Sequence, residues 1–381
     1  MNNLFSKFRV SVIAGALGLG VVSTPLIAVE DVLKTASVNS VMAKDNLLLD
    51  LAKAGQRIVA VGSRGHILFS DDKGESWQQA NVPVSTLLTA VSFVDRWNGW
   101  AVGHSGVILH TADAGENWQV QFDGDQANKM IITQSEQKLA KMQAELETLP
   151  EDEQEDLVYE IEEADFALED ARFDAEVGAS KPLLDVLFSN KEEGFVVGAY
   201  GYIFKTIDGG KSWANYGSRV ENPDRFHLNA IAQIEGGTLF AVGEAGVIFR
   251  STDFGETWEG LESPYSGSFF GVSGTGDKNV ALVFGLRGNL FRTEDAGDTW
   301  SPVDSGTEST LMSANGNGKG FISIVGNSGS MLFSRDNGRT FSESIRDDRL
   351  GNASGIYVAP TEMILVGEGG INHTTPAGLD L

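Results

Sequence analysis

The chain has 381 residues, a formal net charge of −25 and no cysteine. The absence of cysteine from the sequence excludes disulfides, thiol chemistry, thiolate metal sites and lipid attachment to an N-terminal cysteine. The strong negative charge argues against nucleic acids and anionic lipid surfaces as partners, and it permits basic patches on a partner protein.

The first 28 residues have the layout of a secretory signal peptide. Lys7 and Arg9 form a short basic region, residues 10–22 are apolar and rich in Gly and Ala, and Ala28 suits the last position before cleavage. The apolar run is shorter than the roughly 20 residues that a membrane-spanning helix needs. We therefore expect cleavage, no membrane insertion of the remaining chain, and a periplasmic location.

Six segments repeat the pattern Ser/Thr-x-Asp-x-Gly-x-x-Trp/Phe, called here the Asp motif. Four of the five intervals between the motif aspartates are 41–45 residues, and the fifth, of 95 residues, must contain an insertion. The Asp side chain can accept backbone N–H bonds within a turn, and we expect the aromatic side chain to fill the seam between repeats. The residues given these structural roles are Asp72, Trp77, Asp113, Trp118, Asp208, Trp213, Asp253, Trp258, Asp295, Trp300, Asp336 and Phe341.

A second pattern, Gly-x-x-Gly, precedes each Asp motif, and a seventh copy lies at 367–370. A repeat of about 40 residues with this texture is typical of a four-stranded propeller blade. The Gly-x-x-Gly pair would turn between strands two and three, and the Asp motif between strands three and four. We predict an all-β, seven-bladed propeller over residues 29–381. Its last blade has three strands of its own, and we expect the segment near 32–40 to add the fourth and close the ring.

Residues 125–176 interrupt the repeat between blades two and three. They contain 17 acidic and four basic residues, and their apolar residues follow helical heptad spacing on both sides of Pro150. This pattern predicts an antiparallel helical hairpin. It is either a solvated decoration or an arm that grips a partner, and we favour the arm.

In a propeller, the two-to-three turns and the loops between blades emerge on one face, called here the turn face. The hairpin and all Gly-x-x-Gly turns should therefore share that face, with the Asp motifs opposite. The residues between the two glycines are free to vary, either as tolerated turn residues or as a binding surface. The predicted binding residues in these turns and in the loop before blade four are Arg64, His104, Tyr200, Arg225, Glu244, Arg287, Asn327 and Glu368.

The paired motifs resemble those of the photosystem II stability/assembly factor family, seven-bladed propellers within the wider group of bacterial neuraminidase-type repeats. The resemblance covers roughly residues 35–375 apart from the hairpin. It implies a non-enzymatic scaffold for assembling membrane proteins. Relatives in non-photosynthetic bacteria are exported and often associated with exporters of the resistance-nodulation-division type, the inner-membrane partner we expect here. A photosynthetic host would instead point to photosystem II. The acidic hairpin departs from the photosynthetic members.

The competing class is a carbohydrate-binding or glycoside-hydrolysing propeller of the sialidase type. The sialidase signature Phe-Arg-Ile/Leu-Pro does not occur, since Arg250 and Arg292 are followed by Ser and Thr. Glu244 and Glu368 lie three blades apart, too far for a catalytic carboxylate pair. The five His residues show no metal-binding spacing. We therefore expect no catalytic residue, no metal and no cofactor.

Overall fold

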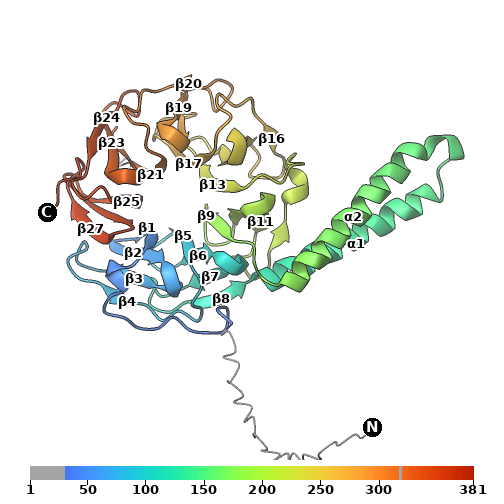
Figure 1. The fold of residues 1–381 in the computed structure, drawn as a ribbon, viewed down its shortest axis with the longest axis horizontal. Helices are drawn as coiled ribbons and strands as arrows, with labels where there is room; N and C mark the ends of the chain where they lie inside the picture. The colour runs from blue at the N-terminus through green and yellow to red at the C-terminus, as the bar shows by residue number, and fades with distance from the viewer. Residues whose placement is uncertain (1–30, 317–319) are drawn as a thin grey trace, which may run out of the picture. The chain divides into compact units, whose positions relative to one another are not determined.

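The computed structural model describes residues 31–316 and 320–381, and the predicted signal peptide lies outside them. The strands form seven antiparallel sheets, which follow one another in chain order around a ring (Figure 1). Six of these sheets have four strands and the last has three. The chain is therefore a seven-bladed β-propeller, as the repeats predict.

Each blade is a meander in which the first strand is innermost. The strands are β1(Leu48–Ala54), β2(Arg57–Gly62), β3(Ile67–Ser70) and β4(Gln78–Gln79) in blade 1; β5(Leu88–Phe93), β6(Gly99–Gly103), β7(Ile108–Thr111) and β8(Gln119–Phe122) in blade 2; β9(Leu183–Phe188), β10(Gly194–Gly198), β11(Ile203–Thr206) and β12(Ala214–Asn215) in blade 3; and β13(Leu228–Gln233), β14(Leu239–Gly243), β15(Ile248–Ser251) and β16(Glu259–Gly260) in blade 4. The remaining strands are β17(Phe269–Gly274), β18(Ala281–Gly285), β19(Leu290–Thr293) and β20(Ser301–Pro302) in blade 5; β21(Leu311–Gly316), β22(Ile322–Gly326), β23(Ser330–Ser334) and β24(Ser342–Ile345) in blade 6; and β25(Asn352–Ala359), β26(Glu362–Gly367) and β27(Gly370–Thr374) in blade 7.

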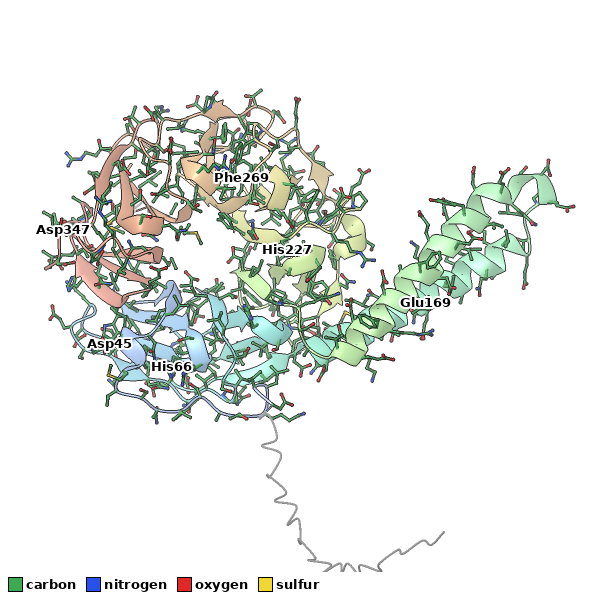
Figure 2. All side chains as sticks on the ribbon, viewed as in Figure 1. Asp45, His66, Glu169, His227, Phe269 and Asp347 are labelled. Atoms are coloured by element: carbon green, nitrogen blue, oxygen red, sulfur yellow. The ribbon has the colours of Figure 1, made fainter. Side chains whose placement is uncertain are left out.

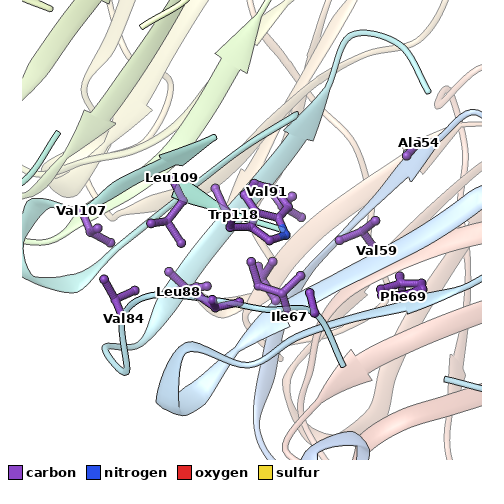
Figure 3. Packing of buried hydrophobic residues seen from close by; sticks show 14 residues of the cluster. Ala54, Val59, Ile67, Phe69, Val84, Leu88, Val91, Val107, Leu109 and Trp118 are labelled. Atoms are coloured by element: carbon purple, nitrogen blue, oxygen red, sulfur yellow. The ribbon is translucent and has the colours of Figure 1, made fainter. Parts of the chain in front are cut away.

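The core of the ring is divided into apolar clusters, each shared by two neighbouring blades. Trp118 of blade 2 lies with Val59 and Ile67 of blade 1 in one cluster (Figure 3). Its ring meets that of Phe93 edge-on at a centroid distance of 6.0 Å. The aromatic residues of the other five Asp motifs occupy the equivalent seams, as predicted: Trp77, Trp213, Trp258, Trp300 and Phe341. The seam between blades 6 and 7 contains Tyr357 instead, and its hydroxyl lies 2.6 Å from the Ser323 hydroxyl.

The Asp motif is a turn held by its own side chains. In blade 1, Asp72 Oδ1 accepts hydrogen bonds from the Ser76 amide at 2.9 Å and the Ser70 hydroxyl at 2.8 Å. Hydrogen bonds from Ser76 lower the pKa of Asp72 to about 2, so the carboxylate is ionised at neutral pH. Gly74 has φ +97, and a Cβ there would lie 2.5 Å from Ile364 Cδ1 of blade 7. The glycine is thus required both by the turn and by the seam.

Basic side chains of one blade bind the Asp motif of the next blade. Arg250 Nη1 donates to the Ala296 carbonyl at 2.8 Å and pairs with Asp298 at 2.6 Å. Lys205 Nζ makes the same pair of contacts with the Phe254 carbonyl and Glu256. These polar contacts hold the rim of the seam, while the apolar clusters fill its interior.

The predicted closing strand near 32–40 is wrong. That segment contains no strand, and it lies along blade 1, where the Ser37 amide donates to the Val82 carbonyl at 3.0 Å and the Ser85 amide to the Val32 carbonyl at 2.9 Å. The ring is closed by side-chain packing between blades 1 and 7. Leu51 and Ile58 of blade 1 share an apolar cluster with Ile364 of blade 7.

The outer edge of blade 7 is covered by the last residues of the sequence. Asp380 forms an antiparallel bridge with Thr374, and the Leu381 amide donates to the His373 carbonyl at 3.0 Å. Arg346 of the preceding blade pairs with Asp380 at 2.9 Å. The fourth-strand position that we assigned to residues 32–40 is therefore partly filled from the other end of the chain.

The insertion is a helical hairpin of α1(Gly124–Leu146) and α2(Glu155–Val177), with a short 3-10 turn, η4(Glu151–Glu153), between them. Asp123 caps α1 by accepting a hydrogen bond from the Gln126 amide. The first turns of α1 belong to the seam between blades 2 and 3, where Ala127 is buried. Among the described residues, no helix is long and apolar enough to cross a membrane.

Replacing Trp118 with Ala should lower the free energy of unfolding by about 3–5 kcal/mol, because the side chain is 4% exposed and fills the seam between two blades. Trp97 in the same blade is 46% exposed, and Trp97→Ala is the matched control, expected to cost about 1 kcal/mol or less. Urea unfolding followed by circular dichroism measures both. Equal losses would contradict the assignment of the seam as the main source of stability.

Candidate functional site

The Gly-x-x-Gly turns form short 3-10 turns between strands two and three of six blades: η2(Ser63–Gly65), η3(His104–Gly106), η5(Ala199–Gly201), η7(Glu244–Gly246), η8(Leu286–Gly288) and η9(Asn327–Gly329). The two glycines serve different purposes. The first is extended and allows close approach, since a Cβ on Gly243 would lie 1.8 Å from the His227 carbonyl oxygen. The second has positive φ, as at Gly246 (+79).

The residue before the second glycine is also left-handed, a conformation uncommon for residues other than Gly. Arg64, Tyr200 and Arg287 all have φ 58 at this position. The turn therefore fixes the direction in which each side chain leaves the ring. This feature was not expected from the sequence, which suggested that the two glycines alone supply the geometry.

All eight predicted binding residues are exposed: Arg64, His104, Tyr200, Arg225, Glu244, Arg287, Asn327 and Glu368. The structure brings three of them together on neighbouring blades. They are Tyr200, Arg225 and Glu244. Tyr200 and Arg225 line one cavity. The ring centroids of Tyr200 and His227 are 5.0 Å apart, and His227 Nδ1 lies 4.0 Å from Glu244 Oε2. Figure 2 labels His227 on the ring. The other members are distributed over the turns of blades 1, 2, 5, 6 and 7.

Two of the eight have a role within the fold. Glu244 accepts a hydrogen bond from the His227 amide at 3.2 Å, and Glu368 accepts one from the Gly351 amide at 3.0 Å. Each carboxylate thus orients the loop that enters the innermost strand of its own blade.

A groove lies between the base of the hairpin and blade 3. One part, of about 270 Å³, is lined by Ile131, Ala171, Tyr202 and Arg225 among others. A second part, of about 450 Å³, is lined by Phe173, Val177, Lys181 and Tyr200. Both parts share Asp174, Lys181, Tyr200 and Arg225, so the two form one continuous surface, called here the base groove.

Charged and aromatic side chains organise the base groove. Lys181 pairs with Asp174 of α2, and its ammonium lies 5.2 Å from the ring centroids of both Tyr200 and Tyr202. Asn215 of β12 donates to Gln134 of α1 at 3.1 Å, which ties the hairpin to the outer strand of blade 3. Burial raises the pKa of Tyr202 far above its usual range, so its phenol stays neutral.

A cavity of about 330 Å³ occupies the centre of the ring, and the innermost strand of every blade contributes to its lining. Each of these strands has a bulge near its start, as between Leu48 and Asp50. The Asp50 carboxylate accepts a hydrogen bond from the Val91 amide of blade 2 at 2.9 Å, and Asp185 accepts one from the Ile231 amide of blade 4 at 2.8 Å. Burial raises the pKa of Asp50 to about 6, and burial together with the Asp50 charge raises that of Asp185 to about 7.

Sequence reasoning missed these two aspartates and Lys181. A signal for the aspartates exists, because both follow a Leu-Leu pair in an innermost strand, where all five other blades have Ala, Gly or Ser at the aligned position. In the part of the chain that the structure describes, no group of three or more His, Asp or Glu side chains is arranged to hold a metal ion.

The structure thus combines exposed turns on one face of a seven-bladed propeller with a groove beside an inserted helical hairpin. The sequence profile of the family described as photosynthesis system II assembly factor YCF48 matches residues 37–148 and 169–321. The chain therefore belongs to that family. No curated protein matches the chain.

Solved structures agree on the fold. A structure described as YCF48 bound to D1 peptide is 16% identical with a TM-score of 0.59, covering 87% of this chain and 93% of its own. YCF48 from Cyanidioschyzon merolae is 14% identical with a TM-score of 0.56, covering 87% and 96%. The WD40 propeller domain of Doa1 is 9% identical with a TM-score of 0.57, covering 89% and 94%. At these identities the comparison shows the fold alone.

From Asp50 and Asp185, which line the central cavity, we expect an unusual pH dependence of stability. Their folded-state pKa values of about 6 and about 7 lie above the value of about 3.9 for an unfolded chain. The folded protein therefore binds more protons than the unfolded one, and stability should rise as the pH falls from about 8 to about 5. The double variant Asp50→Asn/Asp185→Asn keeps an acceptor for each amide, and it should melt on the order of 5 °C higher than the natural protein at about pH 8, with no gain near pH 5.

Thermal melting across this pH range measures the effect. Asp152→Asn, at an exposed residue of the hairpin tip, is the control and should leave the profile unchanged. Parallel profiles for the natural protein and the double variant would contradict the assignment.

Proposed function

We propose that the protein is a non-catalytic, periplasmic protein-binding scaffold that serves as an assembly or accessory factor for a membrane protein complex. One observation carries the proposal: Tyr200, Arg225 and Lys181 gather with the base of the acidic hairpin in one groove on the turn face. Aromatic and arginine side chains in a groove are the types that dominate binding energy in protein interfaces. Membership of an assembly-factor family supports the same reading.

The preferred partner is an inner-membrane exporter of the resistance-nodulation-division type, on the family resemblance. In a photosynthetic host the partner would be a photosystem II subunit, in line with the related structure described as bound to D1 peptide. The periplasmic location rests on the signal-peptide pattern of residues 1–28.

The contacts of the charged side chains support the absence of catalysis. The Asp-motif carboxylates accept hydrogen bonds within their turns, as Asp295 does from Thr299 at 2.9 Å. Arg250 pairs with Glu259 and Asp298, and Arg292 pairs with Glu294. These arginines therefore hold the blades and are not gathered around a substrate carboxylate as in sialidases. A glycan-active propeller remains the alternative, and hydrolysis of any member of a broad glycoside panel by the purified protein would favour it.

A crosslinked pull-down from the envelope of the native host tests the proposal. The groove variant is Tyr200→Asn/Arg225→Asn, because Asn tolerates the left-handed backbone at φ 58 and φ 52. The matched control is Ile207→Asn/Lys211→Asn in an exposed Asp-motif turn on the opposite face. The natural protein and the control should recover an integral membrane complex, and the groove variant about tenfold less of it.

Equal recovery by the groove variant and the control would move the contact away from the groove. Recovery of no membrane protein by any of the three would contradict the scaffold role. All three proteins should first show the same melting temperature, so that a loss of recovery reports binding.

A further inference from the structure

An exposed aromatic stripe runs along α2. Tyr159, Phe166 and Phe173 are 63%, 68% and 66% exposed, and Val177 one turn further is 61% exposed. The three aromatic residues are seven positions apart, so they lie along one side of the helix over about 21 Å. We call these four residues the aromatic stripe.

The hairpin does not use this stripe for its own folding. Its internal core consists of Leu139 and Met142 from α1 with Ala164 and Leu168 from α2, all buried. None of the stripe residues belongs to that cluster, which packs against the side of α2 that faces α1. Large aromatic side chains at regular spacing on an exposed face mark an interaction surface.

Carboxylates flank the stripe on both sides. Glu162, Glu163, Glu169 and Asp170 are exposed and lie three or four positions from Phe166, which places them beside it on the helix surface. Figure 2 labels Glu169 on α2. The only basic residue of α2, Arg172, is paired with Glu136 of α1 at 2.8 Å. The stripe therefore presents aromatic rings between two rows of negative charge.

The stripe continues into the base groove. Phe173 and Val177 line the same cavity as Tyr200 and Arg225 of the ring. A partner segment seated on the stripe would thus reach the turn face of blade 3 at Tyr200.

We propose that the aromatic stripe binds an amphipathic, basic helix of the partner protein, with apolar side chains about every seven residues between Lys and Arg. This inference rests on the proposed scaffold function and specifies which segment of the partner is bound. Charge complementarity selects the occupant, since a basic helix meets the two acidic rows. A second copy of this chain is disfavoured, because two hairpins with 17 acidic and four basic residues each would repel one another.

Binding of a fluorescent designed peptide tests the inference. The peptide is a helical heptad repeat with Leu at the apolar positions and Lys elsewhere, and a second version has Glu in place of Lys. Fluorescence anisotropy measures the Kd of each for the full protein. The basic peptide should bind, the acidic one should not, and raising the salt from about 50 mM to about 500 mM should weaken binding several-fold.

The stripe variant is Tyr159→Gln/Phe166→Gln/Phe173→Gln, which keeps the charge and uses a good helix former. It should bind the basic peptide about tenfold more weakly or worse, while Ile207→Gln, at a residue 67% exposed in an Asp-motif turn, should bind as the natural protein does. Circular dichroism confirms that the hairpin is retained.

A second pair of variants tests the acidic rows. Glu162→Gln/Glu163→Gln/Glu169→Gln removes three charges beside the stripe, and Glu151→Gln/Asp152→Asn/Glu153→Gln removes three at the hairpin tip. The variant beside the stripe should weaken binding of the basic peptide, and reduce the salt dependence of that binding, more than the variant at the hairpin tip.

The inference fails if the basic peptide does not bind, or if the acidic peptide binds as tightly as the basic one. It also fails if the stripe variant and the Ile207→Gln control bind the basic peptide equally well, or if the protein dimerises through the stripe. The envelope pull-down separates this inference from the scaffold role. If the stripe variant still recovers the membrane complex as the natural protein does, the scaffold role stands and the stripe inference fails.

Discussion

The apolar seam between neighbouring blades is the interaction on which the rest of this structure depends. Each seam places an aromatic side chain of one blade, such as Trp118, among aliphatic residues of two blades. The seam also requires glycine where the Asp motif of one blade meets the next, as at Gly74 against Ile364. Because the closing seam between blades 7 and 1 is built from the same kind of side-chain packing, the ring needs no shared strand, and residues 32–40 are free to lie along blade 1.

The rigid ring gives the turn face its properties. In six blades, the Gly-x-x-Gly turn holds one of the two residues between the glycines in a left-handed conformation, and this restricts the direction of Tyr200 or Arg287 while leaving their identity free. An insertion at the loop between blades 2 and 3 adds the hairpin beside blade 3 without disturbing any strand. The base of α1 is part of the seam through Ala127, so the hairpin is anchored to the ring and its distal part is available for contacts.

Repeats made the fold predictable from the sequence. Motif spacing identified the seven blades and the seam positions of the motif aromatic residues from Trp77 to Phe341, and heptad spacing identified the hairpin, because each is a local pattern. Closure was missed because it depends on packing between residues some 300 positions apart, such as Leu51 and Ile364.

The site was predictable only in part. Tyr200 and Arg225 were expected on one face, but their meeting with Lys181 and Phe173 depends on how the hairpin leaves the ring. The heptad pattern of α2 identified its buried side. The aromatic stripe could not be predicted from that pattern, because its exposure depends on which residues of α1 and α2 form the hairpin core.

We propose that a protein partner contacts the turn face beside the hairpin. The most direct measurement is site-specific photocrosslinking in the native host, with a photoreactive residue at Tyr200 and, as the comparison, at Ile207 on the opposite face. We expect the photoreactive residue at Tyr200 to form an adduct with one membrane protein and the one at Ile207 to form none. Adducts at Ile207 alone, or at neither position, would contradict it.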